Sequence, residues 1–192
     1  MNDHIMMEFD EHISVIEKLR GSMCGIQDAA KLICNCLNNG GTVFICGNGG
    51  SAADSQHFAA ELTGRFRRER ASLSAIALTT DTSAITSIAN DYSFAEVFSR
   101  QLSGLASGGD VLLGISTSGN SENVLNAVSW ARHNGVHTIS LTGKKLAPIH
   151  KLCDHNILVE SENTARIQEA HILVIHLICE LVEHEMGNIE NA

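Results

Sequence analysis

The sequence predicts an α/β protein in which helices cover both faces of a parallel β-sheet. Five short apolar segments that read as strands alternate with segments of helical spacing. The third of them, Val111–Ser116, begins with a continuous apolar run, which is typical of a strand that is covered on both faces. Alternation of strands and helices implies crossover connections, and these place helices on both sides of a parallel sheet.

The expected elements follow from apolar spacing and from the turn residues between them. The expected strands are Thr42–Cys46, Ala75–Leu78, Val111–Ser116, Thr138–Leu141 and Ile157–Val159. Helices are expected at about 52–63, 82–90, 94–105, 121–133, 146–152 and 164–186. No low-complexity linker interrupts this order, so we expect one domain over residues 1–192, with an α/β core at 42–186.

A long helical segment, residues 1–37, precedes the core and has a break near Gly21. Met6, Phe9, Ile13 and Ile16 follow a 3-4-3 spacing, which gives an apolar stripe of the kind that packs on other helices. The segment therefore predicts oligomerisation. Asn38-Asn39-Gly40-Gly41 then ends the helix, as glycine and asparagine commonly do.

Composition limits the classes of function. The formal net charge of −9 disfavours binding to nucleic acid and to anionic membranes. There is no signal-peptide pattern and no apolar run of about 18 residues, and the six cysteines form no C-x-x-C pair, so we expect a cytoplasmic protein with reduced thiols. The one basic cluster, Arg65–Arg70, favours a solvated loop, with contacts to a sugar phosphate or a partner subunit left open.

Two loops are expected at the carboxyl ends of strands, where parallel sheets bind ligands. The first is Cys46-Gly47-Asn48-Gly49-Gly50-Ser51, between a strand and a helix N-terminus. Such a turn presents free backbone N–H groups and the positive end of a helix dipole to an anion. It matches neither the P-loop pattern nor G-x-G-x-x-G, so a nucleotide site is not supported.

The second loop is Ser116-Thr117-Ser118-Gly119-Asn120-Ser121, which follows the third strand. Ser121 is placed to cap the next helix, and an ordinary capped turn is the simpler interpretation. A capped turn needs one serine, however, and this loop carries four hydroxyls, so phosphate binding is favoured.

Two helices carry polar side chains suited to chemistry. His57 and Glu61 lie four residues apart on one helix face, and the pair suits a transition metal, proton transfer or a simple surface hydrogen bond. On the last helix, a lone histidine such as His176 is more commonly a hydrogen-bonded core residue than a ligand. Gln168 and His176 lie eight residues apart, about 12 Å along an ideal helix, so sharing one metal needs converging side chains, a bent helix or a site between subunits. Asn90 and Asp91 are either a helix end or part of a substrate site.

Together these motifs resemble the sugar isomerase (SIS) domain group, and within it the phosphoheptose isomerases, which act on sedoheptulose 7-phosphate. The resemblance rests on residues 46–51, 57–66, 89–91, 114–121 and 166–171, and it extends from the N-terminal helix to about residue 186. It implies a five-stranded parallel sheet in a flavodoxin-like three-layer sandwich. It also implies a homotetramer with active sites at subunit interfaces.

The resemblance further implies an aldose–ketose isomerase that forms D-glycero-D-manno-heptose 7-phosphate for lipopolysaccharide or other surface glycans. The family's zinc ligands correspond to His57, Glu61, Gln168 and His176. Substrate contacts correspond to Asn48, Gly49, Gly50, Ser51, Glu61, Asn90, Asp91, Ser116, Thr117, Ser118, Ser121 and Gln168. As acid and base for the proton transfer we favour Glu61 and His176, although a carboxylate that binds zinc is a poorer base.

Three alternatives stay open. Some relatives act as DnaA-binding replication initiation factors without isomerase activity, and the retention of Glu61 and His176 favours the enzyme. A sugar-phosphate-sensing SIS protein and an isomerase of another phosphosugar are the others. The chain departs from the family pattern after Gly143, where Lys144–Pro148 replaces a glycine-rich segment.

Overall fold

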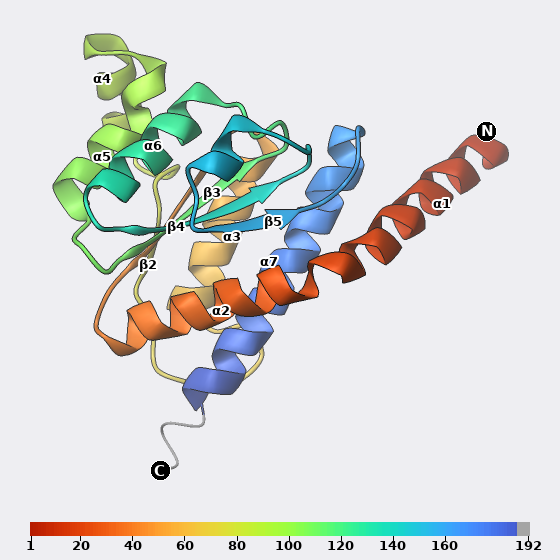
Figure 1. Cartoon of the computed structure of the whole chain (residues 1–192), viewed down its shortest axis with the longest axis horizontal. Helices are drawn as coiled ribbons and strands as arrows, with labels where there is room; N and C mark the ends of the chain where they lie inside the picture. The colour runs from red at the N-terminus through yellow and green to blue at the C-terminus, as the bar shows by residue number, and fades with distance from the viewer. Residues whose placement is uncertain (188–192) are drawn as a thin grey trace.

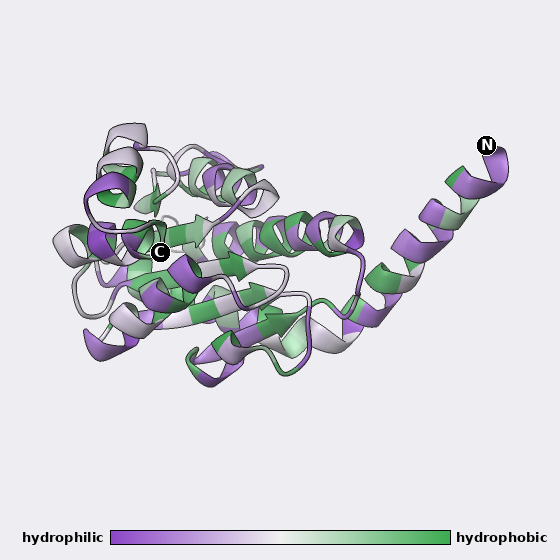
Figure 2. Cartoon of the chain, turned by 90° about the horizontal axis from the view of Figure 1, so that it is seen from above, coloured by the Kyte–Doolittle hydropathy of each residue, from purple (hydrophilic) through white to green (hydrophobic). Residues whose placement is uncertain are grey.

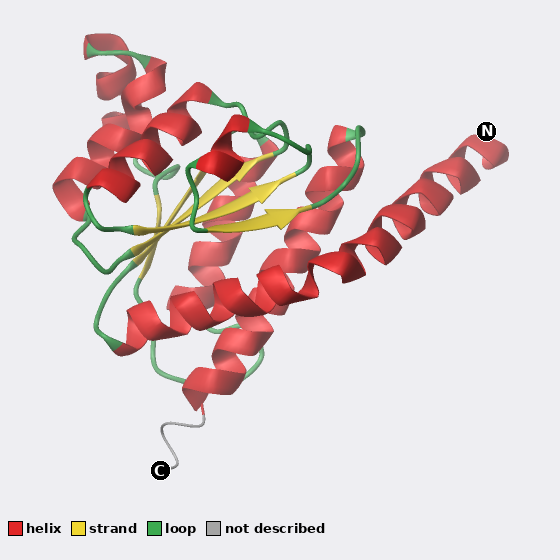
Figure 3. Cartoon of the chain, in the orientation of Figure 1, coloured by secondary structure: helices red, strands yellow, loops and turns green. Residues whose placement is uncertain are grey.

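The computed structural model describes residues 1–187 and confirms the predicted α/β class, a three-layer sandwich. Its five strands are all parallel and lie in the order β2-β1-β3-β4-β5 (Figures 1 and 3). The strands are β1 Val43–Gly47, β2 Ala75–Ala77, β3 Val111–Ser116, β4 His137–Thr142 and β5 His155–Leu158. Each begins or ends within two residues of its expected limits. Residues 188–192 of the predicted domain lie outside the described residues.

Helices cover the two faces of the sheet separately (Figure 1). One face packs against α2 (Met23–Asn38), α3 (Gly50–Thr63) and α7 (Thr164–Gly187). The other packs against α4 (Thr82–Asp91), α5 (Val97–Leu105) and α6 (Glu122–His133). Short 3₁₀ turns, η1 Arg20–Ser22, η2 Phe94–Glu96 and η3 Pro148–Lys151, complete the chain.

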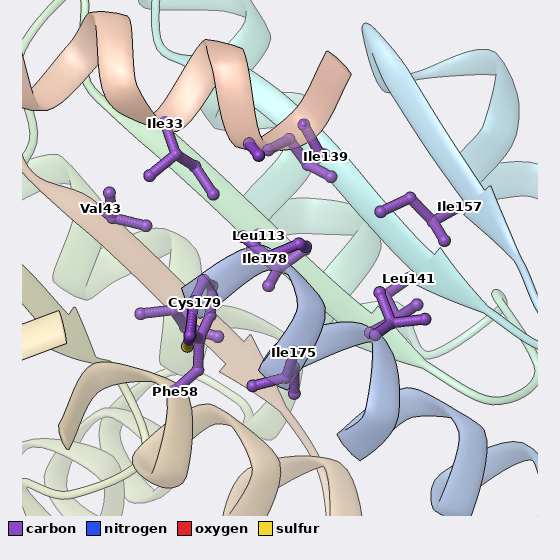
Figure 4. Packing of buried hydrophobic residues seen from close by; sticks show 14 of the residues in the cluster. Ile33, Val43, Phe58, Leu113, Ile139, Leu141, Ile157, Ile175, Ile178 and Cys179 are labelled. Carbon is purple, nitrogen blue, oxygen red and sulfur yellow. The ribbon is translucent and has the colours of Figure 1, made fainter. Parts of the chain in front are cut away.

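The strands are apolar on both sides because both faces are buried. In β1, Val43 and Ile45 enter the core under α2, α3 and α7, whereas Phe44 and Cys46 enter the opposite core. Figure 4 shows the first of these cores, in which Leu113 of β3 lies near Ile178 of α7. This packing fixes α3 and α7 side by side on one face of the sheet.

The N-terminal segment breaks where the sequence predicts. Helix α1 (Asn2–Leu19) ends just before Gly21, and α2 continues after η1. The first part of α1 extends beyond the body of the molecule, and apolar residues interrupt its polar surface (Figures 1 and 2). Ile5, Phe9 and Ile13 are 51 %, 60 % and 54 % exposed. Of the predicted stripe, Met6 (57 % exposed), Phe9 and Ile13 are thus open to solvent within one chain, whereas Ile16 packs against the core.

The expected helix at 146–152 is wrong. Leu146 has a φ of 59°, in the left-handed region, and Pro148 cannot continue a helix from residues before it, so only the 3₁₀ turn Pro148–Lys151 forms. The expected helix at 94–105 likewise begins as the 3₁₀ turn η2 and becomes α5 at Val97. Among residues 1–187, no helix is both long and apolar enough to cross a membrane.

Candidate functional site

The two predicted anion loops meet at the carboxyl edge of the sheet. The first follows Gly47 at the end of β1, and the second follows Ser116 at the end of β3, the strand beside β1. The strand order reverses between β1 and β3, and crevices at such reversals bind ligands in open α/β sheets. Helices α3 and α6 begin at these loops, so both helix N-termini lie at this edge of the sheet.

The first loop needs glycine at its turn. Gly49, the residue before α3, has a φ of 56°, which other residues rarely adopt, and α3 has no side-chain cap. Backbone carbonyls satisfy part of this first turn, because the N–H groups of Ser51 and Ala52 donate to the carbonyls of Asn48 and Gly49 at 3.0 Å. No capping side chain covers the N–H groups that precede them, which is the arrangement that anion-binding helix N-termini use. Asn48, Gly49 and Gly50 lie in this turn, and the buried Ser51 begins the helix interior.

The second loop is held by its own hydroxyls. Ser116 Oγ accepts a hydrogen bond from the Gly119 N–H at 3.1 Å and lies 3.0 Å from Ser121 Oγ. Ser118 Oγ accepts from the Asn120 N–H at 3.2 Å. The predicted side-chain cap is wrong, because Ser121 occupies the N-cap position but its hydroxyl faces Ser116 instead of the helix. The first turn of α6 thus keeps its N–H groups directed to the loop.

A reciprocal pair of amides joins the two loops. Asn48 Nδ2 donates to Asn123 Oδ1 and Asn123 Nδ2 donates to Asn48 Oδ1, both at 2.8 Å. Asn123 lies in the first turn of α6 and is 3 % exposed. Sequence reasoning missed it, although an asparagine one turn into a helix that follows a candidate phosphate loop was a signal available in the sequence. The pair fixes Asn48, a predicted substrate contact, relative to α6.

Three predicted catalytic or metal-binding residues lie together between α3 and α7. His57 Nε2 is 3.0 Å from His176 Nε2 and 3.3 Å from Glu61 Oε1. Burial lowers the pKa of His176, and His57 acts in the same direction, whereas Glu61 opposes the shift. The two imidazoles can share one hydrogen bond only when at least one is neutral, so the lowered pKa suits the contact.

Gln168 reaches the same side of α3 from two turns earlier on α7. A Cβ atom placed on Gly50 would lie 2.5 Å from Gln168 Nε2, so the amide packs closely on the first residue of α3. Among the described residues, no hydrogen bond joins Gln168 to His57, Glu61 or His176. The structure thus brings three of the four predicted ligands together and places the fourth beside the first anion loop.

The donor set fits zinc in kind, and the two distances from His57 fit it in spacing. Zinc takes imidazole nitrogen and carboxylate oxygen at about 2.0–2.1 Å in a tetrahedron, whose ligand atoms lie about 3.3 Å apart. The distances of 3.0 Å and 3.3 Å around His57 Nε2 are close to that edge. In this trio of side chains, His57 shares a hydrogen bond with His176 and is within ion-pair distance of Glu61, and within residues 1–187 no three His, Cys, Asp or Glu side chains already surround a common metal position.

Asn90 and Asp91 are not joined to the rest of the site. They are the last residues of α4, both are exposed, and Asn90 Nδ2 donates to Asp91 Oδ1 at 2.8 Å. Within the described part of the chain, no other hydrogen bond of either side chain is found. Their predicted contact with substrate stays a prediction.

Asp54 is a further acidic residue on α3, one turn before His57, that sequence reasoning missed. Burial raises the pKa of Asp54 to about 6, and His57 opposes the shift. Its Oδ2 atom is buried and makes no hydrogen bond within the described residues. The signal for it was the i, i+3 spacing to His57, which places both side chains toward one helix face.

Comparison with known proteins identifies the family of the chain. The family model described as "SIS domain" matches residues 9–143. The chain is 51 % identical to the phosphoheptose isomerase of Helicobacter hepaticus, over all of this chain and 97 % of that protein. It is 52 % identical to that of Campylobacter jejuni subsp. jejuni, over 92 % of this chain and 95 % of that one. The solved phosphoheptose isomerase of Neisseria gonorrhoeae superposes with a TM-score of 0.90 at 45 % identity, over 95 % of this chain and 98 % of that one. The chain with this fold and this pair of anion loops therefore belongs to the SIS domain family and, within it, to the phosphoheptose isomerases.

Proposed function

We propose that the chain is an aldose–ketose isomerase that converts sedoheptulose 7-phosphate to D-glycero-D-manno-heptose 7-phosphate. The observation that carries the proposal is that His176 and Glu61 lie 3.0 Å and 3.3 Å from His57 Nε2, on helices whose neighbouring loops suit a phosphate. Relatives about 50 % identical over nearly the whole chain carry the name phosphoheptose isomerase, which supports it.

The phosphate is bound by the second loop in this proposal. Ser116, Thr117, Ser118 and Ser121 supply hydroxyl donors, and the N-terminus of α6 supplies backbone N–H groups and a favourable dipole. Binding at this end fixes the open-chain sugar, so its first two carbons lie in one place relative to the protein. The residues proposed to contact the rest of the sugar are Asn48, Gly49, Gly50, Ser51, Glu61, Asn90, Asp91 and Gln168.

Glu61 and His176 carry the proton transfer. The Glu61 carboxylate removes a proton from C1 of the ketose, which gives an enediol, and His176 returns a proton to C2 as the oxygens exchange theirs. A neutral His176 becomes a donor only after it takes up a proton, and His57, 3.0 Å away, is placed to exchange one with it. Glu61 thus supplies the base, and His176 with His57 supplies the proton donor, beside the reacting carbons.

We further propose a zinc ion held by His57, Glu61, Gln168 and His176. When bound there, zinc would polarise the sugar carbonyl and stabilise the negative charge that develops on its oxygen. Gln168 would have to turn from Gly50 toward the trio, whereas the other three side chains are already together. Glu61 would then alternate between metal and substrate during turnover.

The proposal includes a cytoplasmic homotetramer that uses a sugar phosphate and no nucleic acid or membrane. The exposed apolar stripe on α1 supports an assembly through the N-terminal segment, with active sites at the subunit interfaces. All six cysteines are free, which is consistent with a reducing compartment. The product would enter the synthesis of nucleotide-activated heptose for lipopolysaccharide or other surface glycans.

An isomerase assay with sedoheptulose 7-phosphate tests the proposal. The protein is assayed after chelator treatment and again after zinc is restored, with Glu61→Gln in parallel. We expect conversion by the wild-type protein, a rise with zinc and loss in Glu61→Gln. Absence of conversion by a folded oligomer in both conditions would refute the isomerase, whereas conversion that zinc does not change would refute the metal.

A further inference from the structure

The basic segment Arg65–Arg70 links α3 to β2, and the assigned roles of the site leave it unexplained. The sequence favoured a solvated loop here, but its last residue is not solvated. The Arg70 side chain is 3 % exposed, and its partner Glu183 on α7 is 2 % exposed. Burying two charges is costly unless they are paired and hydrogen-bonded, so this arrangement calls for a structural reason.

Glu183 accepts hydrogen bonds from the backbone of the segment. Its carboxylate accepts hydrogen bonds from the N–H groups of Phe66, Arg67 and Arg68 at 2.7, 2.9 and 3.0 Å, and it lies 3.5 Å from Arg70 Nε. Burial alone would raise the pKa of Glu183, but the three N–H groups and Arg70 outweigh it and lower the pKa. The ionised carboxylate thus fixes three successive residues against α7.

Arg70 attaches the same segment to the end of α3. Its guanidinium donates to the carbonyl oxygens of Glu61 at 2.7 Å and Leu62 at 2.8 Å. It also donates to the carbonyls of Gly64 at 3.2 Å and Ala71 at 2.9 Å. The last carbonyls of a helix lack partners within the helix, and Arg70 supplies them for the turn that carries the side chain of Glu61.

The segment held in this way places an aromatic ring on His176. The Phe66 ring stacks on the imidazole with centroids 5.4 Å apart and an angle of 25° between the planes. The Arg67 guanidinium lies 4.9 Å from the centre of the Phe66 ring and pairs with Glu180 at 3.0 Å. His57 lies 5.2 Å from the same imidazole, tilted by 59°. The His176 ring therefore has Phe66 and His57 as its two ring neighbours.

We propose that Phe66 is a positioning residue that orients the His176 imidazole, and that the buried Arg70–Glu183 pair holds Phe66 in place. The catalytic reading of this geometry rests on the proposed isomerase function, whereas the orientation of the ring does not. The competing explanation is plain packing, because Phe66 is half-buried and also contacts the core under α2, α3 and α7. The two explanations differ in what they predict for His176 itself.

The first test is side-chain NMR on the full-length, chelator-treated protein. The ring C–H signals of His176 are assigned by their loss in His176→Gln. In Phe66→Leu these signals are expected to move, since the ring current of Phe66 is lost, but this shift reports only the contact. Reorientation of the imidazole is expected to weaken the NOEs between the His176 and His57 rings, and in Phe66→Tyr both signals and NOEs should stay close to wild type. NOEs that are unchanged in Phe66→Leu would overturn the proposal. Trp130→Leu is the matched control, because Trp130 is a half-buried aromatic residue that packs on the opposite core. Unmoved His176 signals in Phe66→Leu would overturn the proposal.

The second test is steady-state kinetics on the same variants. Phe66→Leu is expected to lower kcat about tenfold and to change KM less than about threefold, since a misplaced proton donor slows chemistry more than binding. Phe66→Tyr should restore most of kcat. An equal fall in Phe66→Leu and Trp130→Leu would indicate a general packing effect and would overturn the proposal.

Glu183→Gln tests the support of the ring. It keeps the shape of the side chain and removes the charge, so we expect His176 signals that move in the same direction as in Phe66→Leu and a fall in kcat. If this variant does not fold, the two Phe66 variants still decide the question. If the wild-type protein does not isomerise sedoheptulose 7-phosphate, the proposed function fails, and the NMR result alone decides whether Phe66 positions His176.

Discussion

The two anion loops and the trio of His57, Glu61 and His176 are parts of one candidate site, but they are built in different ways. The loop Ser116–Ser121 is contiguous in sequence and is held by hydrogen bonds between its own residues. The trio joins two helices that lie more than 100 residues apart in sequence, and His57 meets His176 only because both helices pack on one face of the sheet. One region depends on local backbone geometry, and the other depends on the core.

This difference separates two tasks. The loops occupy the carboxyl edge of the sheet, where helix N-termini favour an anion whatever the rest of the ligand is. The trio lies two turns further along α3, and in the proposed mechanism small changes in the orientation of its side chains alter proton transfer. Binding of phosphate and chemistry should therefore respond to different substitutions, and four predictions examine that separation.

Substitution in the trio should have the largest effect. His176→Gln removes the proposed proton donor, and we expect kcat to fall by about 10²–10⁴-fold, the usual contribution of general acid–base catalysis. Binding of inorganic phosphate, followed by chemical shifts of the amides in the two loops, should remain within about twofold of the wild-type value. A matching loss of phosphate binding would show that the two regions do not act separately.

The sequence predicted the local region far better than the assembled one. Gly49 was recognisable because glycine geometry acts over a few residues, and Ser121 does occupy the N-cap position of α6, although its hydroxyl bonds to Ser116 and not to the helix. The contact between Asn48 and Asn123, 75 residues apart, depends on strand order, which spacing does not specify.

The Arg70–Glu183 pair escaped prediction for the same reason, and a row of arginines favoured a solvated loop because most such rows are solvated. Spacing alone also left the pairing of His57 with His176 open, and only the family resemblance placed both residues in one site. The roles of the individual site residues stay predictions.

The second prediction concerns His171, a histidine of α7 between Gln168 and His176. It is fully buried, and neither ring nitrogen has a hydrogen-bond partner among the described residues. Burial lowers the pKa of His171 to about 4, and the Thr142 backbone acts in the opposite direction. Between that pKa and the ordinary value near 6.5, only the unfolded chain binds the proton, so stability is full above pH 6.5 and falls as the pH drops.

The resulting loss in the free energy of unfolding is about 3 kcal/mol between pH 7 and pH 4. In His171→Leu this part of the acid sensitivity should disappear, which urea unfolding at pH 7 and pH 4 measures against the wild type. An identical pH dependence in the two proteins would contradict the prediction. Because His171 lies in the core under α7 and not in the anion loops, the phosphate affinity of His171→Leu at pH 7 should equal that of the wild type.

The third prediction concerns the amide pair that links the loops. Asn123→Ala leaves Asn48 without its partner, and the lost order is expected to raise KM about tenfold while kcat changes less, since about 1–2 kcal/mol of binding is lost. Asn126→Ala is the control, because Asn126 lies on the same helix and donates to the Ala95 carbonyl at 3.1 Å, away from the loops. An effect on kcat alone would place Asn123 with the trio instead of the loops.

The smallest expected effect lies in the Lys144–Pro148 segment, which packs against the second loop through Ala147 and Gly119. Leu146 holds a φ of 59° with 96 % of its surface exposed, so it has strain without burial to offset it. Leu146→Asn should raise the free energy of unfolding by roughly 0.5 kcal/mol, because asparagine tolerates the left-handed region, and kinetics should not change.

Gly119→Ala is the opposite case. The φ of Gly119 is 62°, and a Cβ atom there would clash with Ala147, so both the free energy of unfolding and the affinity for phosphate should fall. Equal, unchanged affinity in both variants would mean that the segment does not shape the second loop, and that this loop is held by its serine hydroxyls alone.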